Sequence, residues 1–163
     1  MKKIGRQQLS GRKQGGAAVI EFALVLPILL FIAVGIIYYG YVFMLDAAVT
    51  HAAKQGAQVA AYVDPVGLDG TEYQDAVTAQ VNTSVTNSLS WLPNSVLDNL
   101  GAEPVNVSFS GPAAGIPGGI VIITVTMNVS GGTSPLLPQI NLPGFGAVPP
   151  LPLTLNGVAQ VVL

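Results

Sequence analysis

The residues best placed to do chemistry lie where a basic segment meets a long apolar one. The string runs through Gly16, Ala17, Glu21, Phe22 and Pro27. Glu21 is a lone carboxylate in apolar surroundings, and an ionisable residue there indicates a functional site even at the edge of a membrane span. If a peptidase cuts between Gly16 and Ala17, the new amino group lies one helical turn from Glu21. The two charges can then pair, within one chain or between neighbouring chains, in a low-dielectric setting.

No set of residues for catalysis or metal binding accompanies this string. His51 is the only histidine and the chain has no cysteine, so it has no histidine-based triad, multi-histidine metal site or disulfide. Asp64, Asp69, Glu72 and Asp75 lie within a span of twelve residues. They lack the spacing of a calcium-binding EF-hand loop, and acids at a helix start explain the last two. We therefore expect no enzymatic activity, no cofactor, no metal site and no small-molecule substrate.

The charges divide the chain into a basic start and an acidic remainder. Five of the six basic residues precede Gly16, and only Lys54 comes later. From Ala17 onward the chain has one base and eight acids, a net charge of −7. A surface that follows nucleic-acid phosphates needs clustered Lys and Arg side chains, so we expect no nucleic acid among the partners.

One apolar segment is long enough to cross a membrane. The 24 residues from Phe22 to Leu45 carry no charge, and as a helix they span about 36 Å, against roughly 30 Å for a hydrocarbon core. The apolar core of a cleavable secretory signal is shorter, at ~7–15 residues. Basic residues stay on the cytoplasmic side. We therefore expect residues 1–16 to be a basic cytoplasmic leader, and everything after the single span to lie outside the cytoplasm.

The helix is expected to continue beyond the membrane, covering residues 17–63 over roughly 70 Å, half in lipid and half emergent. Asp64 and Pro65 end it, because the residue before a proline is disfavoured in the helical region. Small or apolar side chains recur at helical spacing through the emergent half: Ala48, Val49, Ala52, Ala53, Gly56, Val59 and Ala60. This stripe suits close packing, either against the protein's own domain or against another molecule, and the sequence leaves both open.

Residues 64–163 are expected to form a small extracytoplasmic α+β domain. A capping box, with Thr71 as N-cap and Gln74 three positions later, predicts a second, amphipathic helix that Pro93 ends. Apolar residues recur at helical spacing between these points: Tyr73, Val77, Val81, Val85, Leu89 and Leu92. Alternating or β-branched residues predict strands at 105–109, 120–129 and 151–163. A long helix, a shorter helix and a small antiparallel sheet of about three strands make the α+β class.

The segment 131–150 contains five prolines and four glycines, which exclude regular structure over most of it. A 20-residue loop without structure is uncommon in a compact domain and is often functional. Apolar residues recur through it, so it is unlike a polar linker. It either folds back over the sheet or offers an apolar binding surface to a partner or to the membrane. Folding back over the sheet is the favoured alternative.

The amino-terminal string resembles the pilin-type processing signal, and specifically the TadE-like family of tight-adherence (Flp) pilus minor pilins. Gly16 is followed by Glu21 and Phe22 at the fifth and sixth positions after it, and then by the run Ala-Leu-Val-Leu-Pro at 23–27. Downstream, Ala-Ala-Lys-Gln-Gly-Ala at 52–57 looks like the small-residue helix segment of the family. The resemblance is dense over about residues 15 to 61 and weak beyond.

The resemblance implies a set of roles and partners. It implies cleavage between Gly16 and Ala17 by a prepilin peptidase, with Glu21 and Phe22 completing the signal. It also implies residence in the bacterial cytoplasmic membrane and contacts with other pilins and pilus assembly proteins. The residues expected to serve assembly or helix packing are Glu21, Pro27, Ala52, Ala53 and Gly56.

Three classes of function follow from these patterns. The leading class is a minor pilin or pseudopilin, a structural or assembly component of an adhesive pilus. The second is a single-pass envelope-anchored binding or accessory module that is never built into a filament. The third, an extracytoplasmic enzyme, lacks any nucleophile, base or metal set in the sequence. The mass of the mature protein separates the first two, because only a pilin signal predicts loss of residues 1–16.

Overall fold

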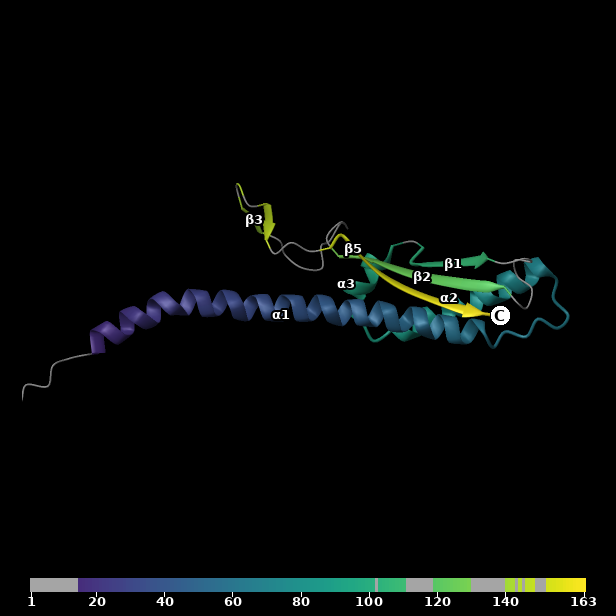
Figure 1. Ribbon diagram of the computed structural model, residues 1–163, viewed down its shortest axis with the longest axis horizontal. Helices are drawn as coiled ribbons and strands as arrows, with labels where there is room; N and C mark the ends of the chain where they lie inside the picture. The colour runs from purple at the N-terminus through teal and green to yellow at the C-terminus, as the bar shows by residue number, and fades with distance from the viewer. Residues whose placement is uncertain are drawn as a thin grey trace, which may run out of the picture. The chain divides into compact units, whose positions relative to one another are not determined.

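The computed structural model describes residues 15–101, 103–110, 119–129, 140–142, 144, 146–148 and 152–163 (Figure 1). The leader up to residue 14, Leu151 and most of the loop at 131–150 lie outside the described residues. The chain divides into two compact units, Met1–Ile37 and Tyr38–Leu163, and each is described by itself. A long helix, a second helix and a three-stranded antiparallel sheet confirm the expected α+β class.

The first unit contains the first half of helix α1, which runs over Gly15–Ala60. Its large apolar side chains, such as Phe22 and Phe31, are exposed. Among the described residues, α1 is the helix that is long and apolar enough to span a membrane, and none of its most apolar stretch is buried within the protein. A helix that is apolar all round and has no protein to cover it is typical of a membrane span. α1 therefore fits a single-pass membrane anchor.

The α-helical part of α1 ends at Ala60, three residues before the expected end at Val63. The backbone N–H of Tyr62 donates to the carbonyl oxygen of Val59 at 3.0 Å, and that of Val63 to the carbonyl oxygen of Ala60 at 3.4 Å. These bonds join residues three apart, as in the 3₁₀ turns that are frequent at helix ends. The last turn before Asp64 is thus tightened rather than α-helical.

Helix α2, Gly70–Leu89, buries the predicted apolar face. The predicted cap of Thr71 with Gln74 is wrong, because Asp69 is the N-cap and Glu72 its partner. Asp69 Oδ1 accepts from the Glu72 N–H at 2.8 Å, and Glu72 Oε2 accepts from the Asp69 N–H at 3.3 Å. Both pairs have capping-box spacing, but aspartate caps better than threonine, and both carboxylates favour the positive end of the helix dipole.

Three strands form one antiparallel sheet in the order β1-β2-β5. β1 is Val105–Ser110, β2 is Ile120–Asn128 and β5 is Thr154–Val162. In the register, Ile123 of the central strand lies between Val107 and Ala159. Each strand confirms a predicted one, although β5 begins at Thr154 rather than at 151.

Four short elements were not predicted. Helix α3, Asn94–Leu97, and the 3₁₀ turn η1, Asp98–Leu100, are too short to show a helical period in the sequence. Strands β3, Ile140–Leu142, and β4, Gly146–Val148, form a hairpin inside the segment where we expected little regular structure. Gly144, at φ +88°, supplies the left-handed conformation in the turn between them.

Helices α1 and α2 cover one face of the sheet in the second unit (Figure 1). Gly56 of α1 marks the place where helices and sheet meet. A Cβ atom at this position would lie 3.2 Å from methyl carbons of both Val81 and Val85 on α2, and 3.6 Å from one of Ile123 on β2. Alternate residues of β2 face the same core: Val121, Ile123, Val125 and Met127 are fully buried, as is Val129 directly after the strand.

Gly157 of β5 allows the closest approach of the sheet to α1. A Cβ atom there would lie 2.6 Å from the carbonyl carbon of Val49 and 2.8 Å from Thr50 Cα, so no side chain fits. The strand backbone therefore lies directly against the helix backbone. We did not predict this contact, although an isolated glycine in a strand pattern indicates a bulge or a close backbone approach.

Gly157→Ala is expected to destabilise the protein by about 1–3 kcal/mol, because the added methyl group forces β5 away from α1. Gly40→Ala is the matched control, since a Cβ atom there has no neighbour within 4 Å and alanine favours a helix over glycine. Thermal unfolding of the full chain in detergent should give a lower Tm for Gly157→Ala only. Equal Tm values for the two variants would contradict the contact.

Candidate functional site

The residues expected to direct processing lie in the first turns of α1. Gly16 is exposed, and a Cβ atom there would meet no other atom within 4 Å. The first four N–H groups of a helix have no partner within it, and helix ends open at little cost in free energy. The peptide bond between Gly16 and Ala17 therefore lies in the part of α1 that unwinds most easily, which suits entry into a protease.

Glu21 lies one helical turn after Ala17, and its side chain is exposed. At 1.5 Å per residue, it stands about 6 Å along the helix axis from the Ala17 nitrogen. Lys54 is the only Lys or Arg after Lys13, and it comes 33 residues later than Glu21. For a chain that begins at Ala17, the positive groups within reach of Glu21 are therefore its own terminal amine and groups of other molecules.

Phe22, the residue after Glu21, and Pro27 are both exposed on the first unit. Proline has no N–H, so the helical bond from Pro27 to the Ala23 carbonyl oxygen is missing. In lipid an unpaired carbonyl is unfavourable unless a neighbouring group satisfies it. The turn between Ala23 and Pro27 is thus a local weak point in the hydrogen-bond ladder of α1.

Ala52, Ala53 and Gly56 belong to the second unit, so the structure does not bring them together with the processing residues in one unit. Ala52 and Ala53 have no exposed surface, and Gly56 faces α2 and β2. Of the two alternatives for the small-residue stripe, packing within the protein's own domain is thus the one observed. A partner would have no access to Ala52 or Ala53 in this fold.

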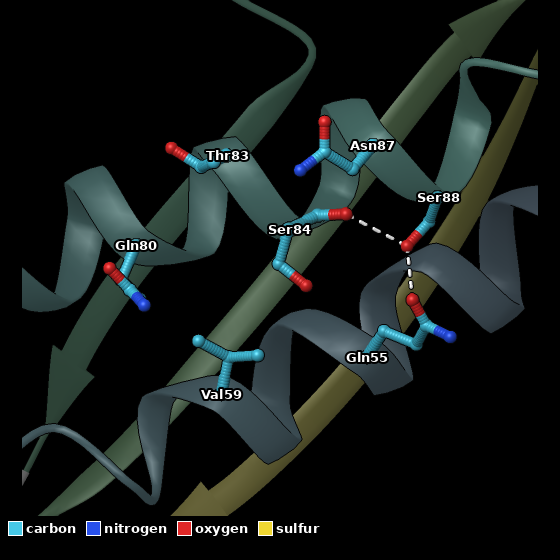
Figure 2. Close-up of a pocket in the computed structure, with 7 residues that line it drawn as sticks. All are labelled: Gln55, Val59, Gln80, Thr83, Ser84, Asn87 and Ser88. Atoms are coloured by element: carbon cyan, nitrogen blue, oxygen red, sulfur yellow. Dashed lines mark hydrogen bonds between the residues drawn. The ribbon is translucent and has the colours of Figure 1, made fainter.

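A polar groove of about 500 Å³ lies between α1 and α2 (Figure 2). The Ser88 hydroxyl lies within hydrogen-bonding distance of Gln55 Oε1 on α1 and, at 2.8 Å, of the Ser84 carbonyl oxygen. It has one proton and donates to one of them at a time. The lining side chains are all uncharged: Gln55, Val59, Gln80, Thr83, Ser84, Asn87 and Ser88. The groove can form hydrogen bonds but offers no acid, base or charge. We did not predict it, because these residues look like any solvated helix face.

Acidic residues near the start of α2 accept local backbone hydrogen bonds. Asp64 Oδ1 accepts from the Val66 N–H at 2.9 Å, and Asp69 and Glu72 form the capping box. Within the described part of the chain, no group of three or more His, Cys, Asp or Glu side chains is placed to hold a metal ion. His51 is exposed on α1.

The buried phenol at the start of α2 ties this helix to the end of α1. The Tyr73 hydroxyl donates to the Val63 carbonyl oxygen at 3.5 Å. Burial raises the pKa of the Tyr73 phenol above its usual range, because a low-dielectric site disfavours the phenolate.

The comparisons with known proteins bear on α1 alone. The model of one family, described as TadE-like protein, matches residues 16–58. No curated protein and no solved structure matches the chain. The matched range begins at Gly16, includes Glu21 and Pro27, and ends two residues before α1 does. Residues 16–58 are therefore a TadE-like segment, and the resemblance of this part of the chain to the TadE-like family of Tad pilus systems is confirmed.

Proposed function

We propose that the protein is a minor pilin or pseudopilin of a tight-adherence (Flp) pilus, a structural or assembly component involved in surface adhesion. The observation that carries this proposal is the extent of the TadE-like match, which starts at Gly16 and runs along α1 to Gln58. A TadE-like segment indicates a component associated with Tad pili, a structural rather than an enzymatic family. The exposed apolar half of α1 supports the same assignment, since an anchored subunit needs a membrane span.

The protein resides, in this proposal, in the bacterial cytoplasmic membrane with its amino terminus inside and the second unit outside. The support is the charge distribution, because five of the six basic residues precede the apolar segment and basic residues are retained in the cytoplasm. Assembly into a pilus then follows extraction of α1 from lipid into contacts with other pilins.

The proposal includes processing by a prepilin peptidase, which cuts between Gly16 and Ala17. Gly16→Arg is expected to leave the precursor uncut, because a large charged side chain replaces the smallest residue at the cleavage position. Gly11→Arg carries the same change five residues earlier and should be cut normally. Mass spectrometry of the membrane-bound protein should show a mature chain that begins at Ala17 for wild type and Gly11→Arg. A mature wild-type chain that keeps residues 1–16, in a host with the peptidase, would overturn this step.

Glu21 is the proposed docking group. Cleavage creates an amine one turn from its carboxylate, and in lipid each charge is unfavourable without a partner. A neighbouring subunit offers the same pair, so Glu21 of one copy and Ala17 of the next can neutralise one another. The alternative is that Glu21 is solvated among headgroups and only favours the positive end of the helix dipole.

Glu21→Ala should insert and be cut normally but fail to support the pilus, with adhesion reduced at least about tenfold, as for loss of one partner of a buried charge pair. Glu21→Asp should be partly defective, since the shorter side chain reaches less far. Glu103→Ala removes an exposed carboxylate of the second unit and should adhere like wild type. For all four proteins we compare the amount of protein in the membrane, the extent of cleavage and the pilus-dependent adhesion. Normal adhesion of Glu21→Ala would mean that the charge has no docking role.

The second candidate is an envelope-anchored binding or accessory module outside the filament. The neutral polar groove between α1 and α2 is the observation that favours it, because amides and hydroxyls can hold an uncharged polar ligand. This candidate requires neither cleavage after Gly16 nor a pilus phenotype. The mass of the mature protein therefore separates the two.

A further inference from the structure

Strand β5 is an edge of the three-stranded sheet, and its outer side carries backbone groups that no described residue pairs with. Its nine residues pair with β2 in an unbroken register. The Leu163 N–H donates to the Gly119 carbonyl oxygen at 2.9 Å, and hydrogen-bonded pairs alternate along an antiparallel ladder. The N–H and C=O groups of Val158, Gln160 and Val162 therefore point away from β2.

This edge lacks the features that keep natural edge strands from pairing. Proteins protect such edges with charged side chains, prolines or bulges. β5 has none of these, and the sequence from Pro104 to Leu163 contains no charged residue. Val158 and Val162 are 56% and 69% exposed. An unprotected edge of this kind is a template for a further strand.

A groove of about 380 Å³ lies between the β5 edge and α1. β5 touches the backbone of α1 at Val49 and follows the helix toward its end (Figure 1), and the groove lies between residues 159–161 and α1 residues 54–62. Small side chains such as Ala57 and Ala61 line it. Side chains of a strand alternate between the two faces of a sheet. Every second side chain of a strand added to β5 would thus enter this groove.

The width of the groove suits one extended segment and excludes a second folded copy. Three strands are about 14 Å wide, at ~4.8 Å each, whereas two packed helices are about 20 Å wide, at ~10 Å each. The helix layer is thus wider than the sheet by about 6 Å, which is room for one strand and not for another helix. A second copy would bring its own helices beside α1, so the occupant is an extended segment alone.

Lys54 gives the groove a positive charge. It lines the groove, its side chain is exposed, and it is the only Lys or Arg after residue 13. The nearest acids along the chain are Asp46 and Asp64, eight and ten residues away, whereas helical ion pairs join residues three or four apart. A carboxylate on the added segment would therefore complement Lys54, and a base there would be repelled.

We propose that the β5 edge and the groove beside α1 bind one extended segment of a partner protein, which adds to the sheet as a fourth strand and places a carboxylate on Lys54. The outward backbone groups of Val158, Gln160 and Val162 form the hydrogen bonds, and small apolar side chains of the segment fill the groove. The site lies wholly within the second unit. It depends neither on the membrane span nor on the proposed role in a pilus.

The probe for this site is a fluorescent peptide, Ser-Val-Thr-Glu-Thr-Val-Ser with both ends blocked, in which both valines and the glutamate share one face. Titrated with the full chain in detergent, it should show saturable binding by fluorescence anisotropy. NMR should show slower hydrogen exchange at the N–H groups of Val158, Gln160 and Val162 when the peptide is bound. A peptide with lysine in place of glutamate should bind about two- to fivefold less tightly, and Lys54→Glu should reverse this preference.

Two variants at one position separate strand addition from adhesion to the exposed face. Gln160→Pro removes an outward N–H and should weaken binding about tenfold, while the bonds to β2 remain. Gln160→Ala loses the same side chain but keeps the N–H, so it should bind like wild type. Equal binding by the two variants, or no saturable binding below about 1 mM, would refute the proposal. Slow exchange of the edge N–H groups without peptide would also refute it, in favour of a second copy if dilution restores fast exchange and of the protein's own chain if it does not.

Discussion

The fold of the second unit depends on the close approach of the α1 backbone to its neighbours. Gly56 lets α1 lie within methyl-carbon contact of α2 and β2 at once, and Gly157 lets β5 lie directly against the backbone at Val49. Side chains at either position would push the layers apart, and protein cores transmit such strain because they are close-packed. The sheet and α2 have no other long helix to cover them among the described residues, so the second half of α1 is an integral part of the domain, while its first half fits a membrane anchor.

One helix therefore meets two environments, and its side chains change accordingly. Around Phe31 large apolar groups face outward, as a lipid solvent requires. Around Ala53 small groups face inward and polar groups such as Gln58 face outward, as water requires. The TadE-like match covers both parts and ends near the end of α1. The matched segment thus includes an exposed apolar stretch that fits a membrane anchor and the central helix of the second unit.

Patterns that repeat along the sequence predicted the fold well. The helical period of α2 and the β-branched run of β2 are long enough to identify each element from the sequence. Both elements are observed, and they confirm the predicted α+β class. Single contacts could not be predicted in the same way. Two possible capping boxes have the same spacing, and the stronger capping by aspartate favours the one that begins at Asp69. Gly16 and Glu21 are exposed, and their roles stay predictions, because those roles depend on a peptidase and on neighbouring subunits, which a single chain does not contain.

Cysteine accessibility along α1 tests most directly whether this one helix both crosses the membrane and forms the core. The chain has no native cysteine, so Phe31→Cys, Ala53→Cys and Gln58→Cys each carry a single thiol. A membrane-impermeant maleimide is added to spheroplasts, and the extent of labelling in SDS gives the reference. The account predicts fast labelling at Gln58→Cys and protection at the other two positions until SDS is added. Labelling of Ala53→Cys as fast as Gln58→Cys, or any labelling of Phe31→Cys before SDS, would contradict it.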